Sequence, residues 1–109
     1  MPTPVFLGEF EQWVLLTLLK LDGPAPVLDL KDRMEELADR SISRGSLYRT
    51  LDRMEEKGWV AWEVDEEDVP ERGGRPRRRF RVTPEGIAVL KESRDALREL
   101  WAGLEGVLG

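Results

Sequence analysis

The spacing of apolar residues changes at Gly58, and this change limits the folds that the chain can adopt. Three segments before Gly58 have apolar residues at helical spacing, on one face in the second and third segments and on more than one face in the first. Residues 59–64 and 78–82 instead alternate apolar and polar side chains, as half-buried strands do. A helical pattern returns after Thr83. The order helix, helix, helix, hairpin, helix predicts an α+β fold that is mostly helical.

Capping residues set the expected bounds of the helices. The first helix covers about residues 7–21 and is apolar on more than one face, so we expect it to be buried on several sides. The second starts near Pro26 and ends near residues 39–40. Ser43 is a suitable N-cap for the third helix, which Gly58 ends.

The second half of the chain predicts a two-stranded hairpin with a long polar tip, followed by one long helix. Thr83 and Pro84 form a typical helix start, and we expect this helix to extend to about Leu108. Its stripe has heptad spacing with one charged interruption: Ile87, Leu90, Arg94, Leu97, Trp101, Leu104 and Leu108.

Positive charge is concentrated in two places although the formal net charge of the chain is −5. Six arginines lie within ten residues of the hairpin: Arg72, Arg75, Arg77, Arg78, Arg79 and Arg81. Residues 40–53, around the third helix, hold four more arginines and one acid. Because the planar guanidinium suits bidentate contact with phosphate, both stretches are candidate nucleic-acid contacts. The alternative is a solvated hairpin, whose arginines are neutralised by the six acids at positions 63–71.

The chain lacks residue types on which many other functions depend. It has no cysteine, which excludes disulfides and thiolate chemistry, and no histidine, the commonest metal ligand and neutral-pH base. No arrangement of the remaining side chains pairs a nucleophile with a base. We therefore expect no enzyme, no catalytic residue, no cofactor and no metal. No apolar run is long enough to span a bilayer, and we expect a cytoplasmic protein.

Three helices followed by a basic hairpin is the order of a winged helix-turn-helix, in which the third helix enters the DNA major groove. Arg44 and Arg49 suit guanine O6 and N7, whereas Tyr48 and the hairpin arginines suit phosphate. Arg53 has the alternative of pairing with Glu56 on its own helix. The predicted DNA-binding residues are Ser43, Arg44, Ser46, Tyr48, Arg49, Arg53, Arg75, Arg77, Arg78 and Arg79.

The last helix predicts a second copy of the chain as its partner. Residues 1–83 would form the winged helix-turn-helix domain, and residues 84–109 would form a dimerisation helix that packs with the first helix. The predicted dimer interface comprises Phe6, Phe10, Leu90, Leu97, Trp101, Leu104 and Leu108. Trp101 has two interpretations: it lies in the dimer core, or with Phe10 and Leu97 it lines a pocket for a flat aromatic effector.

Four motifs resemble the PadR family of bacterial transcriptional regulators. They are LGEFEQ at residues 7–12, SLYRTLDRMEEKG at 46–58, GGRPRRRF at 73–80 and TPEG at 83–86. The resemblance covers nearly the whole chain and implies a winged helix with one C-terminal dimerisation helix, as in the shorter members. It also implies dimeric repressors, many of which small aromatic or phenolic effectors release from operators. The chain departs from the family pattern at residues 25–28, where glycine with an aromatic residue is frequent.

These observations predict a homodimeric, sequence-specific regulator of transcription, a repressor that binds double-stranded DNA at a pseudo-palindromic operator. Its half-sites would lie about one helical turn apart, roughly 34 Å. The alternative is a winged-helix module that binds protein without operator binding, which the net acidity of the chain favours.

Overall fold

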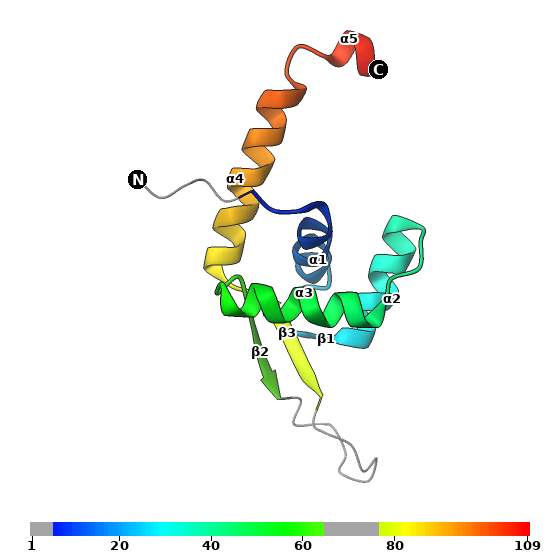
Figure 1. Cartoon of the computed structure of the whole chain (residues 1–109), viewed down its shortest axis with the longest axis vertical. Helices are drawn as coiled ribbons and strands as arrows, with labels where there is room; N and C mark the ends of the chain where they lie inside the picture. Colours follow the sequence, from blue (N-terminus) through cyan, green and yellow to red (C-terminus); the bar gives the residue numbers. More distant parts are fainter. Residues whose placement is uncertain (1–5, 65–76) are drawn as a thin grey trace.

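A computed structural model describes residues 6–64 and 77–109 (Figure 1). Within these residues a helical domain lies between a projecting hairpin and a projecting C-terminal helix (Figure 1). The elements are α1 (Glu9–Lys20), β1 (Ala25–Pro26), α2 (Val27–Ala38), α3 (Arg44–Glu56), β2 (Val60–Val64), β3 (Arg78–Val82), α4 (Pro84–Trp101) and α5 (Glu105–Leu108).

The sheet has three antiparallel strands in the order β1-β3-β2, so the prediction of a two-stranded hairpin was incomplete. The predicted hairpin itself is present, with Trp62 opposite Phe80. The additional strand, β1, pairs Ala25 with Phe80 and Pro26 with Arg79. Two residues are too few for an alternating pattern, and the proline is tolerated because β1 is an edge strand.

The hydrophobic core lies where α2 packs against α1 and α3, where α1 and α2 pack against β3, and where α3 packs against β2. Its largest fully buried side chains come from β3 and the three helices: Phe80, Leu15, Leu30, Met34, Leu47, Leu51 and Met54. The first helix is buried along residues 14, 15, 17 and 18, whereas Leu16 and Leu19 are exposed. Helix α1 is therefore central to the domain but keeps an apolar strip uncovered.

Both predicted N-caps are confirmed. The Ser43 hydroxyl accepts the N–H of Ser46 at 3.3 Å, and the Thr83 hydroxyl accepts the N–H of Gly86 at 3.0 Å. The Thr83 hydroxyl also donates to the carbonyl of Gly58. Helix α4 comes so close to the α3–β2 turn that a Cβ at Gly86 would lie 2.2 Å from the Trp59 carbonyl oxygen.

The prediction that the last helix reaches Leu108 was wrong. Helix α4 ends at Trp101, and the short α5 follows after a break. Gly103 at the break has a φ of 82°, in the left-handed region where a helix ends readily. The apolar spacing continues through the break and so does not reveal it. The last turns of α4 project from the domain with α5 beyond them (Figure 1).

Candidate nucleic-acid interface

One face of α3 is buried and the opposite face carries the predicted DNA-binding residues. Leu47, Leu51 and Met54 are fully buried, as their spacing of four and three predicts. The exposed side chains on the opposite side, which we call the recognition face, are Arg44, Tyr48, Arg49, Asp52 and Arg53. Because both sets lie on one rigid helix, the core determines how the recognition face is presented.

The turn that precedes α3 is held by the carboxylate of Glu35 on α2. One oxygen of Glu35 accepts the backbone N–H of Ile42 at 2.9 Å, and the other contacts Lys31 Nζ at 3.0 Å. The hydrogen bond from Ile42, followed by that from Lys31, lowers the pKa of Glu35 below its usual value. Glu35 was not singled out in the sequence, because its partner lies in a turn seven residues away.

Two arginines of the recognition face are oriented by hydroxyls one turn earlier on the same helix. Arg49 Nη2 donates to Ser46 Oγ at 3.3 Å, and Arg53 Nη2 donates to the buried Thr50 Oγ1 at 3.4 Å. The hydrogen bond of Arg53 thus goes to Thr50, whereas the sequence suggested Glu56. Both guanidinium groups stay on the exposed side of α3, where a ligand can reach them.

The guanidinium of Arg78 lies between α3 and the β2–β3 hairpin. Its Cζ is 5.2 Å from the ring centroid of Phe80, 5.3 Å from that of Trp62 and 6.0 Å from that of Tyr48. Its Nη1 lies 3.6 Å from Oδ1 of Asp52 on α3. Arg78 therefore joins the recognition face to the hairpin.

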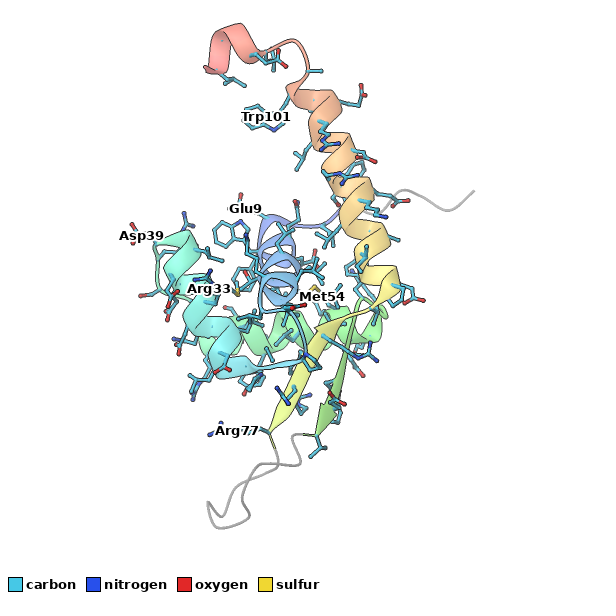
Figure 2. The ribbon with its side chains drawn as sticks, turned by 180° about the vertical axis from the view of Figure 1, so that it is seen from behind. Glu9, Arg33, Asp39, Met54, Arg77 and Trp101 are labelled. Carbon is cyan, nitrogen blue, oxygen red and sulfur yellow. The ribbon has the colours of Figure 1, made fainter. Side chains whose placement is uncertain are left out.

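The hairpin places its predicted arginines on two faces, because successive side chains of a strand point to opposite sides. Arg78 shares the face of the buried Phe80, whereas Arg79 and Arg81 lie on the other face. Arg79 is half-buried, and its Nε has no hydrogen-bond partner among the described residues. Arg77 is exposed at the start of the returning strand (Figure 2). Arg75 lies outside the described residues.

A groove of about 910 Å³ runs between the start of α2, the recognition face and the hairpin. It is lined by Pro26, Val27, Leu28, Arg44, Tyr48, Asp52, Trp62, Val64, Arg77 and Arg78. Leu28, Trp62 and Val64 were not among the residues predicted for this surface, although all three are exposed. The alternating pattern of β2 could have indicated this position, because Trp62 and Val64 lie on the same face of the strand as the buried Val60.

A second groove, of about 520 Å³, lies between α1 and α4. It is lined by Gln12, Leu16, Leu19, Ile87, Leu90, Lys91, Arg94, Leu97, Arg98 and Trp101. Of the predicted interface residues, Leu90 is buried within the protomer, whereas Phe6, Leu97, Trp101, Leu104 and Leu108 are exposed. Trp101 lies on the projecting part of α4, at the opposite end of the molecule from Arg77 (Figure 2).

The three residues of the predicted effector pocket are not brought together within one protomer. Leu97 and Trp101 line the α1–α4 groove. Phe10 instead packs near Trp13, with ring centroids 6.4 Å apart, and lines a different depression with Arg40 and Ile42.

In the described part of the chain, residues 6–64 and 77–109, no helix has the length and apolarity to cross a bilayer. The same residues contain no group of three or more acidic side chains arranged to hold a metal ion.

Comparison with known proteins gives one family model that covers most of the chain. The family described as "Transcriptional regulator PadR-like family" matches residues 15–92. The curated protein "Transcriptional regulator Rv3488" of Mycobacterium tuberculosis (strain ATCC 25618 / H37Rv) is 48% identical over 59 residues, which are 54% of this chain and 50% of that protein. The chain thus spans about half the length of this curated relative.

Two solved structures resemble the whole fold. A PadR family transcriptional regulator from Eggerthella lenta DSM 2243 is 32% identical, with a TM-score of 0.65 over 92% of this chain and 86% of that one. F93 from STIV, a winged-helix DNA-binding protein, has a TM-score of 0.71 over 91% of this chain and 98% of that one. At 14% identity the second likeness concerns the fold alone, which is a winged helix.

Proposed function

Because this chain belongs to the PadR-like family of transcriptional regulators, we propose that it binds DNA as a homodimeric repressor at a pseudo-palindromic operator. The observation that carries the proposal is the recognition face of α3. Three arginines and a tyrosine are exposed on a helix whose other face is fully buried. The adjoining groove continues this basic surface to Arg77 and Arg78 on the hairpin.

The predicted DNA-binding residues have two different roles in the proposal, base contact and phosphate contact. Arg44 and Arg49 contact guanine O6 and N7 in the major groove and supply sequence specificity. The first turn of α3, with Ser43 and Ser46, contacts phosphate, as the positive end of a helix dipole favours. Phosphate contacts that set affinity and register come from Tyr48, Arg53, Arg75, Arg77 and Arg79.

The uncovered apolar surface of α1 and α4 supports the homodimer. Leu97, Leu100 and Trp101 are between 41% and 71% exposed on the projecting part of α4. Exposed apolar surface of this extent marks an interaction site, and a stable interface buries on the order of 1,000 Å² or more. We infer that residues 84–109 pair with α1 and with a second copy, while residues 1–83 bind DNA. A DNA-binding regulator of this kind acts in the cytoplasm.

A small aromatic effector is the further part of the proposal. The α1–α4 groove offers an apolar lining that includes Leu97 and Trp101, and its volume suits a small molecule. Phe10 would have to move or come from the second copy to join it. Titration of aromatic compounds, followed by tryptophan fluorescence in wild type and Trp101→Ala, tests this site. Identical responses of the two proteins would contradict it.

The alternative function is a winged-helix module that binds another protein and no operator, which the formal net charge of −5 favours. Replacement of Arg44 and Arg49 by alanine distinguishes the two functions. We expect operator affinity to fall by about 1–3 kcal/mol for each lost bidentate base contact. Arg33→Ala is a matched control, because Arg33 lies on α2 and pairs with Glu36 at 2.9 Å. Equal affinities of the double variant and the control would favour the alternative.

A further inference from the structure

The side chain of Arg78 has more contacts within the protein than an exposed arginine that is available to bind phosphate. Its guanidinium lies within 6.0 Å of three aromatic ring centroids, and Asp52 lies 3.6 Å from its Nη1. Only 33% of its side chain is exposed, compared with 61% of that of Asp52. A phosphate that bound Nη1 of Arg78 would compete with Asp52 for it.

The partners of Arg78 come from three different elements. Tyr48 and Asp52 belong to α3, Trp62 belongs to β2, and Phe80 belongs to β3 together with Arg78. The chain connects α3 to β2 only through the short turn at residues 57–59. The core fixes the base of the hairpin through the buried Val60 and Phe80, and the Arg78 cluster adds contacts between α3 and the hairpin farther from this turn.

The charge balance of the cluster agrees with a structural connection. Asp52 is the acid of α3 that lies within ion-pair distance of Arg78, and an unpaired carboxylate at this position would repel the phosphates of DNA. Its pairing with Arg78 neutralises both groups before DNA arrives. The guanidinium is planar and weakly hydrated, so it stacks on aromatic rings more closely than the compact, strongly hydrated ammonium of lysine does.

We propose that Arg78 is a positioning residue, which fixes the hairpin against the recognition helix through Tyr48, Trp62 and Asp52 and does not itself contact phosphate. This inference rests on the proposed DNA-binding function, because the orientation of the hairpin matters when both parts engage one duplex. Arg78 then contributes to affinity through the placement of other residues.

Substitution by lysine distinguishes a positioning residue from a phosphate contact. A phosphate contact keeps part of its affinity in Arg78→Lys, because lysine retains the positive charge and loses only the bidentate geometry, whereas Arg78→Met loses the contact altogether. A positioning residue that depends on the planar guanidinium gains little from the charge alone, so we expect Arg78→Lys to lose nearly as much operator affinity as Arg78→Met. The expected loss is about tenfold, which is within the range of a desolvated cation–π contact. Arg81→Lys and Arg81→Met are matched controls on the same strand, since Arg81 is exposed on the opposite face.

The salt dependence of binding supplies a second readout. Loss of a phosphate contact reduces the slope of log K against log salt concentration by about 0.9, whereas loss of a stacking contact leaves it unchanged. We expect both Arg78 variants to keep the wild-type slope. Near wild-type affinity of Arg78→Lys, together with a reduced slope for Arg78→Met, would overturn the proposal.

A measurement without DNA separates this inference from the proposed function. Tyr48 is the single tyrosine of the chain, so its ring resonances identify themselves in an NMR spectrum. In the free protein we expect Arg78→Lys and Arg78→Met to shift the Tyr48 ring and the Trp62 indole resonances, and Arg81→Met to leave them in place. Unchanged resonances in both Arg78 variants would refute the connection. If wild type binds no DNA, the proposed function fails, and the resonances still test the contact.

Discussion

Gly86→Ala is the change for which the fold makes the sharpest prediction. The added Cβ would lie 2.2 Å from the carbonyl oxygen of Trp59, 3.1 Å from its carbonyl carbon and 2.8 Å from Val82 Cγ1. Close C···O contacts in proteins begin at about 3.3 Å, so α4 must move by about 1 Å. The oxygen cannot rotate away, because it also accepts the N–H of Thr83 at 3.0 Å.

The magnitude follows from three contributions. Overpacking against backbone costs about 3 kcal/mol, the upper end of the usual range. Weakening of the hydrogen bond from Thr83 adds about 1 kcal/mol, and the better helix propensity of alanine offsets about 1 kcal/mol. We therefore expect the free energy of unfolding to fall by about 3 kcal/mol.

Urea denaturation followed by tryptophan fluorescence measures this loss, at a fixed protein concentration because the proposed dimerisation would contribute to stability. Gly45→Ala in α3 is the control, since its Cβ would meet the flexible end of Arg49 at 3.4 Å and the Ser43 hydroxyl oxygen at 3.9 Å, an ordinary van der Waals distance. We expect it to be neutral or stabilising by up to about 1 kcal/mol. A Gly86→Ala variant as stable as wild type would refute the close approach of α4 to the α3–β2 turn.

Two further predictions concern other elements. The pKa of Glu35 is lowered mainly by the hydrogen bond from the Ile42 N–H and secondly by Lys31. The ionised carboxylate therefore stabilises the folded state fully above pH 4.5, and this stabilisation is lost as the pH falls through the folded-state pKa. Urea midpoints measured against pH should show a smaller acid-side decline for Glu35→Gln, and an unchanged decline would contradict this role. Leu100→Asp should convert the proposed dimer to monomer in sedimentation equilibrium, because Leu100 is 71% exposed on the projecting part of α4. Leu37→Asp on α2 is its control, and equal masses of the two variants would argue against pairing through α4.

Local signals in the sequence were sufficient for most of the fold. The caps Ser43 and Thr83 and the alternation of the two hairpin strands depend on neighbouring residues, and the structure confirms them. Strand β1 was missed because two residues carry no periodicity. The end of α4 was missed because a heptad pattern counts apolar positions and ignores the left-handed φ of Gly103.

The recognition face was predictable for the same reason, since the helical period separates Arg44 and Arg49 from the buried Leu47. The partners of Arg78 could not be predicted from the sequence. Its contacts depend on the register that pairs Trp62 with Phe80 and on the packing of the hairpin near Tyr48. Likewise, apolar character alone grouped Phe10 with Trp101, whereas packing with Trp13 separates them.

Selection of bound sequences from random double-stranded DNA tests the central proposal, sequence-specific recognition by α3, most directly. We expect enrichment of one pseudo-palindrome whose half-sites are centred roughly 34 Å apart, or a multiple of that distance. Arg44→Ala and Arg49→Ala should relax the preference at guanine positions within each half-site. Recovery of unrelated sequences by wild type, with no preferred half-site, would contradict the proposal.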